Sequence, residues 1–393
     1  MQNKKLLIKK RNILYTILIL PFLQPLMFKE YKSIDDLYII LKIISSIDII
    51  LIFCFKFFKE KIKITKFTDI TFLYLGILFI STILNKASIN RCISYILPIF
   101  SLYLLGEIWI DYNMKDFLSI IGNILSIYIV INLITVIVSP MLDGFSETLM
   151  SKYFFLGEDN RFIFVILPLM CILGIYDYLY KNKISKKTKL VYLICLITLT
   201  YRWSVAAMVA ILMLGLLNNL MIKHKNNLYK YFNIKYIYIL LSLIYIAIVV
   251  FKLQYKLLDV FELMFNKRQT IESRYMLWEW CFNYISKKPI LGYGIEEILV
   301  LKSKFLVNHC HNMFFQITYE TGVLGLISYL LLFYELGKKI MNSKNKDIAK
   351  YSTIIIFIML MLGMFDTLNH AYFFFMMFII YKVLIRNEKN EIK

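Results

Sequence analysis

The sequence predicts an all-α, polytopic membrane protein with about 12 transmembrane helices. Three observations support this fold class: 60% of the 393 residues are apolar, only 18% are charged, and the apolar residues gather in runs separated by short polar segments. An average soluble domain carries about 25% charged residues. A net charge of +20 would suggest a nucleic-acid partner in a soluble protein, but in a membrane protein it first indicates orientation. Soluble enzymes, disordered tails and secreted disulfide scaffolds are disfavoured.

Twelve apolar runs account for the predicted helices, because about 20 residues cross the hydrocarbon core of a bilayer. In chain order the runs are 12–28, 34–55, 68–85, 92–110, 117–138, 162–180, 190–200, 205–222, 236–251, 312–336, 351–366 and 371–385. The first run is expected to serve as a signal-anchor. Run 190–200 is short, so it either begins inside the preceding basic segment or forms one bent hairpin with run 205–222.

The distribution of Lys and Arg predicts that both termini are cytoplasmic. With the N-terminus inside, the inner segments carry 29 Lys and Arg residues, and the short outer loops carry seven. The positive-inside rule predicts such an excess of Lys and Arg on the cytoplasmic side. The two halves of the chain do not resemble each other, which counts weakly against a transporter.

One long connection divides the chain into three predicted regions. Residues 1–251 carry spans one to nine, residues 252–311 form a large extracytoplasmic loop with interfacial helices, and residues 312–393 carry spans ten to twelve. Apolar residues recur at helical spacing from Leu257 to Phe265, which is typical of a helix lying on a membrane. Long ordered loops in compact proteins usually carry function.

Five of the seven arginines fall on the predicted outer face, whereas the other 39 basic residues are lysines. The five are Arg91, Arg161, Arg202, Arg268 and Arg274. The planar guanidinium suits bidentate binding of phosphate, so this set predicts contact with a lipid diphosphate. The alternative is that each arginine caps a helix or contacts a lipid headgroup. Arg202 lies in the hairpin between two spans, where a charge needs a partner or a water-filled cavity.

Histidines at two places are candidates for proton transfer, since imidazole titrates near neutral pH. His309 and His311 flank Cys310 at the end of the long loop. Asp366 and His370 are four residues apart, so they share one face if the helix of run 351–366 continues.

Three further features of the sequence concern metals, disulfides and buried charge. A metal site at His309, Cys310 and His311, with Cys281 as an additional ligand, is disfavoured, because neighbouring residues do not converge easily on one ion and no carboxylate completes a familiar pattern. The sequence permits a disulfide between Cys281 and Cys310 but does not establish one. Lys42 lies inside run 34–55 and is predicted to face a partner on another helix.

Three motifs occur in order on the predicted outer face. The first is Thr-Tyr-Arg-Trp-Ser at 200–204, and the second combines Arg274 and Trp278 with Pro-Ile-Leu-Gly-Tyr-Gly at 289–294. The third begins with His-Asn at 311–312 and runs to Glu-Thr-Gly-Val-Leu-Gly at 320–325. Together they resemble the signature of the O-antigen ligase and polymerase superfamily over roughly a third of the chain, although Tyr201 replaces the usual small residue before the arginine.

The resemblance implies an inverting membrane glycosyltransferase whose glycan donor is linked to undecaprenyl diphosphate. The lipid diphosphate is itself the leaving group, so no cofactor and no metal is expected. His311 is implied as the general base or as the group that orients the acceptor hydroxyl. The lipid diphosphate would be bound by Arg202, Arg274 and Arg161, with support from Asn312, Glu320, Gly292 and Gly294. The alternative for Asn312, Glu320, Gly322 and Gly325 is structural: Asn312 caps span ten, and the glycines permit close packing.

The predicted function is polymerisation of surface polysaccharide repeat units, such as those of a capsule or O-antigen. A growing glycan would pass from undecaprenyl diphosphate to the non-reducing end of a lipid-linked repeat unit. Richness in Ile, Lys, Asn and Tyr indicates an AT-rich genome, and many such bacteria lack an outer membrane, which favours a polymerase. The alternatives are an O-antigen ligase with a final acceptor and, from another class, a lipid-linked oligosaccharide flippase.

The expected location is the bacterial cytoplasmic (inner) membrane, crossed many times. The expected partners are an undecaprenyl-diphosphate-linked oligosaccharide, membrane lipids, and a flippase and chain-length regulator of the same pathway. No nucleic-acid partner is expected.

Overall fold

The computed structural model describes residues 2–60, 62–142, 154–158, 161–202, 204–223, 233–249, 268–368 and 370–390. Within these ranges the regular elements are helices and none is a strand, which confirms the all-α class. The elements are α1 (Gln2–Ile19), η1 (Leu20–Leu23), η2 (Leu26–Glu30), α2 (Lys32–Glu60), α3 (Lys66–Leu84), α4 (Ile89–Leu142), α5 (Ile163–Tyr180), α6 (Lys186–Tyr201), α7 (Val205–Lys223), α9 (Ile234–Val249), α11 (Arg268–Lys287), α12 (Ile298–Phe305), α13 (Met313–Asn342), α14 (Lys346–Gly363) and α15 (Ala371–Asn390).

Within the described residues, each of the twelve apolar runs falls mainly on helical structure. Among the described residues, α2, α3, α4, α5, α7 and α13 are long and apolar enough to cross a membrane, and the chain is a multi-pass membrane protein. The total of twelve crossings stays a prediction. Helix α6 begins at Lys186, so the short run 190–200 starts inside the preceding basic segment, which was one of its two expected forms. The predicted interfacial helix at 257–265 lies outside the described residues, and the division into three regions stays a prediction.

Helix α4 is 54 residues long but is broken at Asn113 (φ −154°, ψ 86°). An unbroken helix of that length would extend about 80 Å, more than twice the hydrocarbon thickness of a bilayer. The side-chain oxygen of Asn113 accepts a hydrogen bond from Asp116 N at 3.0 Å, which caps the second half. The break separates runs 92–110 and 117–138, as the sequence predicts.

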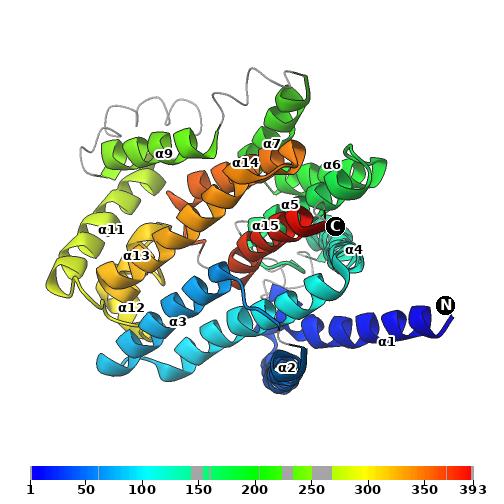
Figure 1. Cartoon of the computed structure of the whole chain (residues 1–393). Helices are drawn as coiled ribbons and strands as arrows, with labels where there is room; N and C mark the ends of the chain where they lie inside the picture. The colour runs from blue at the N-terminus through cyan, green and yellow to red at the C-terminus, as the bar shows by residue number, and fades with distance from the viewer. Residues whose placement is uncertain are drawn as a thin grey trace.

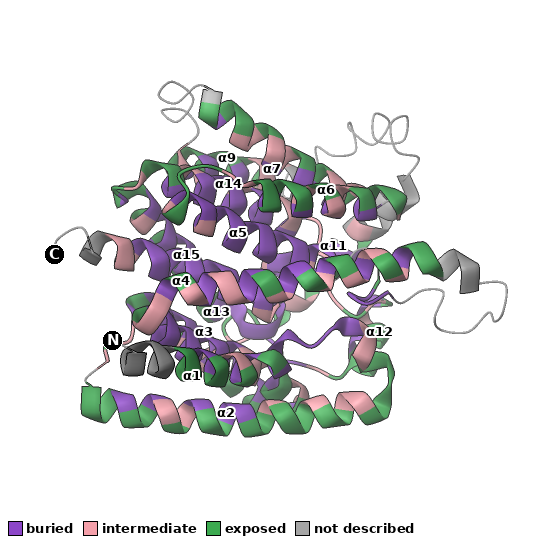
Figure 2. Cartoon of the chain, turned by 90° about the vertical axis from the view of Figure 1, so that its right-hand side faces the viewer, coloured by how far each residue is buried: buried purple, intermediate pink, exposed green. Residues whose placement is uncertain are grey.

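The hydrophobic core contains most of α5, α14 and α15, together with buried residues of α3, α4 and α13. Figure 2 shows buried residues concentrated in these helices and exposed residues along α2 at one edge. The exposed side of α2 is apolar, with Leu37, Ile40, Ile44, Ile47 and Leu51 all at least half exposed. An apolar stripe at this spacing suits contact with lipid. In Figure 1, α11, α12 and α13 lie together at the side of the molecule away from the N-terminus.

A buried ionic cluster ties together α3, α4 and α15. The Glu107 side chain is fully buried and accepts hydrogen bonds from Thr65 N at 3.0 Å and Thr68 Oγ1 at 2.6 Å. Lys382 donates to Glu107 and, at 2.8 Å, to Asp111. Removing one partner of such a cluster leaves an uncompensated buried charge, so the cluster fixes these three helices relative to one another.

Candidate functional site

Helix α13 is broken at Gly322 (φ 62°, ψ −163°). The backbone of residues 289–294, the inserted stretch, lies in this break. Two N–H groups beyond the break donate to the stretch, and two carbonyls before the break accept from it. The four bonds are Val323 N to Pro289 O (2.7 Å), Leu324 N to Ile290 O (3.3 Å), Tyr293 N to Tyr319 O (2.8 Å) and Gly294 N to Glu320 O (2.9 Å). In a continuous helix these two N–H groups would bond these same two carbonyls. The stretch therefore replaces two helix bonds with four of its own.

Two glycines make this insertion sterically feasible. A Cβ atom on Gly322 would lie 2.2 Å from Ile290 O, and one on Gly292 would lie 2.4 Å from Tyr319 O. Both glycines also have positive φ, at 62° and 67°, where a side chain is strained. The structural alternative expected for Gly322 is confirmed, although its close neighbour is the backbone of a loop and not another helix.

Helix α3 supports the other side of the inserted stretch. Ser81 Oγ donates to Glu320 O at 2.9 Å, and Asn85 Nδ2 donates to Gly292 O at 3.0 Å. Just after the stretch, Ile295 N donates to Thr82 Oγ1 at 3.1 Å. The start of α13 is therefore braced by a loop and a helix that are far from it in sequence.

Asn312 connects the start of α13 to the loop between α14 and α15. Its Oδ1 accepts from Phe314 N at 3.0 Å and Phe315 N at 3.1 Å, which confirms the predicted N-cap. Its Nδ2 donates to Met364 O at 3.1 Å, and the Tyr245 hydroxyl donates to its Oδ1 at 3.2 Å. The Asn312 side chain is fully buried. Its amide therefore fixes the α14–α15 loop beside His311, the residue that precedes Asn312 in the chain.

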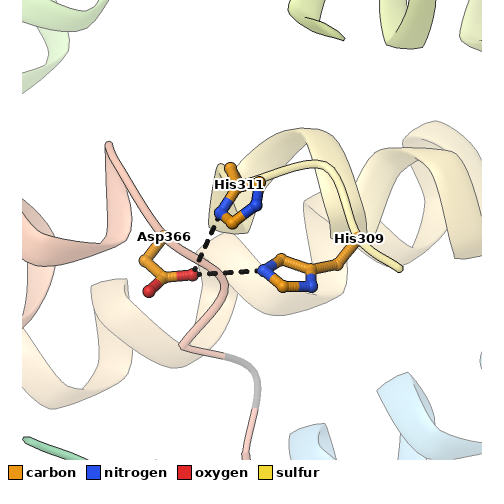
Figure 3. Close-up of side chains that lie close together, drawn as sticks. All are labelled: His309, His311 and Asp366. Carbon is orange, nitrogen blue, oxygen red and sulfur yellow. Dashed lines mark ion pairs between the residues drawn. The ribbon is translucent and has the colours of Figure 1, made fainter. Parts of the chain in front are cut away.

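The α14–α15 loop brings a carboxylate to the two histidines (Figure 3). Asp366 Oδ1 lies 3.5 Å from His309 Nε2 and 3.7 Å from His311 Nδ1. The two imidazole centroids are 4.1 Å apart. Each of the three side chains is about 30% exposed, so the cluster is accessible to a substrate. His311 adopts φ 46°, and this turn allows both rings to face Asp366.

The Asp366 carboxyl is held in its ionised form. Burial raises the pKa of Asp366, but the two imidazoles and the N–H of Thr367, which donates at 2.7 Å, lower it, and the net shift is downward. An ionised carboxylate beside an imidazole orients the ring and stabilises the imidazolium that forms when the ring takes up a proton. The cluster therefore has the parts of an imidazole general base with an orienting carboxylate.

The expectation that Asp366 and His370 share a helical face is wrong. Helix α14 ends at Gly363, and Asn312 takes the Met364 carbonyl that a continuing helix would use. The Asp366 side chain bonds the next backbone N–H, an alternative to helix that Asp commonly provides. His370 instead stacks on Phe164, with ring centroids 5.4 Å apart.

A chain of hydrogen bonds from Glu320 supports the histidine loop. Gln316 Nε2 donates to Glu320 Oε1 at 2.6 Å, and Gln316 Oε1 accepts from Cys310 N at 2.8 Å. Trp278 Nε1 donates to Cys310 O at 3.1 Å. Both backbone groups of Cys310 are thus held by buried side chains, and the supporting role of Glu320 in the site stays a prediction. The thiols of Cys281 and Cys310 are buried and free.

The predicted diphosphate-binding arginines lie at two places. Arg202 ends α6 with its guanidinium 4.4 Å from the centre of the Phe154 ring. Arg161 Nε lies 3.6 Å from Glu158 Oε2. Both side chains therefore contact the segment 154–158. Arg274 is half-buried on α11, one helical turn before the tryptophan that supports the histidine loop.

Residues 190–330 match the protein family described as O-antigen ligase. This range contains Arg202, Arg274, the inserted stretch, His311 and the break at Gly322. This part of the chain, about a third of its length, is similar to the O-antigen ligase family. The superfamily resemblance found in the motifs is thereby confirmed.

Individual proteins are similar to about a quarter of the chain. A protein named as a polysaccharide ligase in Rickettsia conorii is 34% identical over 107 residues, which are 24% of this chain and 26% of that protein. A namesake in Rickettsia felis is 33% identical over 112 residues, 25% of this chain and 28% of that protein. The chain thus matches only about a quarter of the length of these relatives.

The histidine–aspartate cluster is also a set of metal-capable ligands. One ligand atom from each of His309, His311 and Asp366 lies within 4.8 Å of the others. Two imidazoles and one carboxylate suit several divalent transition metals. The argument from sequence against a metal assumed that no carboxylate was near, and that assumption is wrong because Asp366 supplies one.

Sequence reasoning missed Asp366 as the partner of His311 and Gln316 as a support. The signal for Gln316 was its spacing of four residues from Glu320 on one helix. In the sequence, Asp366 is recognisable only as a polar residue at the end of an apolar run. Its two histidine partners lie more than 50 residues earlier in the chain, so no local pattern connects them.

Proposed function

We propose that this protein is a membrane glycosyltransferase that transfers a glycan from a lipid diphosphate to an acceptor hydroxyl during surface polysaccharide synthesis. The observation that carries the proposal is the His309–His311–Asp366 cluster, held at the start of a membrane helix by the Asn312 cap. His309 and His311 lie in the part of the chain that matches the O-antigen ligase family, and Asp366 lies beyond it. Relatives named as polysaccharide ligases support the same class of substrate.

In the proposed reaction, the acceptor hydroxyl oxygen attacks the anomeric carbon of the donor glycan. The bond between that carbon and the diphosphate oxygen breaks, and the electron pair leaves with the lipid diphosphate. The hydroxyl proton passes to His311, whose Nδ1 faces Asp366 and whose Nε2 is then the basic nitrogen. Direct displacement inverts the anomeric carbon. Asp366 stabilises the imidazolium, and arginines stabilise the charge on the departing diphosphate.

We propose a repeat-unit polymerase, in which the acceptor is the non-reducing end of a lipid-linked repeat unit. The names of the relatives favour the second candidate, a ligase that passes the glycan to a final acceptor. In both cases we place the protein in the bacterial cytoplasmic membrane with cytoplasmic termini and with the site on the outer face. The inner excess of Lys and Arg supports this orientation.

The test is to replace His311, Arg202 and Arg274 singly by Ala and to size the polysaccharide and the lipid-linked intermediates in cells. General-base catalysis contributes about 10²- to 10⁴-fold, so His311→Ala should abolish long chains. Ser303→Ala is a matched control, because Ser303 is exposed on α12 and bonds only within its own helix.

Single lipid-linked units that accumulate on the outer face support a polymerase. Finished chains that stay on the lipid support a ligase. Units trapped on the inner face would indicate a flippase, and long chains in all three Ala variants would refute the catalytic assignment.

A further inference from the structure

Two buried thiols meet where α11 packs against the histidine loop, the segment 306–312 that carries both histidines. Cys281 lies on α11, and Cys310 lies between His309 and His311. Both cysteines are fully buried, and one thiol donates a hydrogen bond to the other. The other four cysteines lie one each in α2, α4, α5 and α6. The contact therefore joins the two cysteines of the outer loop.

The backbone of Cys310 is fixed on both sides, so the meeting of the two sulfurs is set by the fold. Trp278 and Cys281 are three residues apart on α11 and share one helical face. From this face Trp278 Nε1 donates to Cys310 O at 3.1 Å. From α13, Gln316 Oε1 accepts from Cys310 N at 2.8 Å. A disulfide needs two cysteines that the backbone already places side by side, and this pair meets that condition.

The surroundings of the pair do not suit a nucleophile or a metal ligand. Trp278, Phe315 and Tyr319 belong to the same buried apolar cluster as the two cysteines. Burial raises the pKa of the Cys310 thiol, whereas a reactive or metal-binding cysteine must be a thiolate. The remaining chemistry for two thiols in contact is a bond to each other.

A bond between Cys281 and Cys310 would enclose the parts of the loop that brace α13. The closed segment has about 30 residues and contains the inserted stretch and α12. The inserted stretch docks into the break of α13 through four backbone hydrogen bonds. Joining the two ends of a segment reduces the conformations that it can adopt when it is undocked. The bond would therefore favour the docked state of the inserted stretch.

The proposed orientation of the protein places this pair outside the cytoplasm. Disulfides form and persist at cell surfaces and in extracytoplasmic compartments, and they are rare in the cytosol. The excess of Lys and Arg in the inner segments supports an outer position for the loop. The four other cysteines lie within the predicted spans, away from the aqueous phase in which thiols are oxidised.

We propose that Cys281 and Cys310 form a disulfide as the outer loop folds, and that this bond fastens the histidine loop to α11. The inference rests on the proposed function in one respect, the outward orientation of the loop. The bond would hold the residue between His309 and His311, so it would help to keep both imidazoles beside Asp366.

The oxidation is a thiol–disulfide exchange with a disulfide-bearing oxidoreductase on the outer face. The thiolate of one cysteine attacks the disulfide of that partner and forms a mixed disulfide. The second cysteine attacks the mixed disulfide, the Cys281–Cys310 bond forms, and the partner leaves as a dithiol. The two protons and two electrons of the cysteine thiols thus end on the sulfurs of the oxidoreductase. Since both thiols are buried in the folded loop, the exchange precedes docking.

The experiment counts free thiols in the full chain. Cells are quenched with acid, the protein is denatured, and its thiols are alkylated with N-ethylmaleimide either directly or after reduction. Intact mass then gives the number of adducts. Since the chain has six cysteines, the disulfide predicts four adducts without reduction and six after it. Six adducts without reduction would overturn the proposal, and this count does not depend on the folding of any variant.

Single substitutions identify the bonded pair. Cys281→Ser and Cys310→Ser should each give five adducts with and without reduction, because the remaining partner is then free. Cys195→Ser is the matched control, since Cys195 is fully buried in α6, and it should give three adducts before reduction and five after it. Three adducts in unreduced Cys281→Ser or Cys310→Ser would assign the bond to other cysteines and overturn the proposal.

Thermal unfolding tests the fastening role of the bond. Reduction should lower the unfolding midpoint of the wild type by about 5 °C and should leave that of Cys281→Ser unchanged. An equal shift in both proteins would show that the bond does not hold the loop, and would overturn that role.

The adduct count needs neither donor nor acceptor, so it separates this inference from the proposed function. Four adducts in a protein that transfers no glycan would refute the function and keep the disulfide, and six adducts in an active protein would do the reverse. Orientation is tested with Ser303→Cys, because Ser303 is exposed on α12. A membrane-impermeant maleimide added to intact cells should label this variant, and absence of labelling would refute the outer loop and the disulfide together.

Discussion

Replacing Asn312 tests whether one buried amide both caps α13 and sets the position of Asp366. Asn312→Ala removes the N-cap, which is worth about 1 kcal/mol, and leaves the buried Met364 carbonyl without a donor, which costs about 1–3 kcal/mol. The expected loss of stability is therefore about 2–4 kcal/mol. The loop that carries Asp366 loses its tether, and misplacement of a catalytic group by about 1 Å can cost about 10²-fold in rate.

A second variant separates the two effects. Asn312→Ser keeps a good N-cap but has no amide to reach Met364 O. It should be more stable than Asn312→Ala by about 1 kcal/mol, yet it should lose turnover to a similar extent. The assays are thermal unfolding of the purified protein and transfer of glycan from a lipid-linked donor. Full activity in Asn312→Ser would refute the tether, and wild-type stability in Asn312→Ala would refute the cap.

Three further predictions concern the same region. Asp366→Asn should lower turnover by about tenfold or more, because loss of the carboxylate removes the charge that stabilises the imidazolium; turnover equal to that of the wild type would contradict the pairing with His311. Gly322→Ala should destabilise the protein by about 3 kcal/mol or more in thermal unfolding, whereas Gly76→Ala, whose Cβ meets nothing within 4 Å, should change stability by less than about 1 kcal/mol. Turnover should be unchanged in excess EDTA, and a loss that Zn²⁺ or Mn²⁺ restores would reassign His309, His311 and Asp366 as metal ligands.

The helices that coincide with the twelve apolar runs could be predicted from the sequence, because each of these runs is local in the chain. The break of α4 at Asn113 was visible as a polar gap between two runs, and the Asn312 cap was visible as a cap residue before an apolar run. The motif around His311 indicated the superfamily and the candidate base. These features depend on residues that are close together in the chain.

The partners across the site could not be predicted in the same way. Their spacing places Asp366 and His370 on one face only if the helix continues, but α14 ends at Gly363 and Asn312 binds the Met364 carbonyl. Trp278 was noted as part of a motif, yet its bond to Cys310 O joins residues 32 positions apart. Contacts of this kind depend on the tertiary packing, which no local pattern encodes.

The break in α13 constrains how the protein is assembled in the membrane. An isolated α13 would expose two N–H groups and two carbonyls near Gly322, and each unsatisfied backbone group costs several kcal/mol in hydrocarbon. The residues that satisfy them, 289–294, precede the helix in the chain and are therefore synthesised first. Stable insertion of α13 thus requires that residues 289–294 dock against it. Substitutions in the inserted stretch should therefore reduce the amount of protein in the membrane, because the misassembled chain is degraded during biogenesis. This loss should occur before any effect on turnover could be measured.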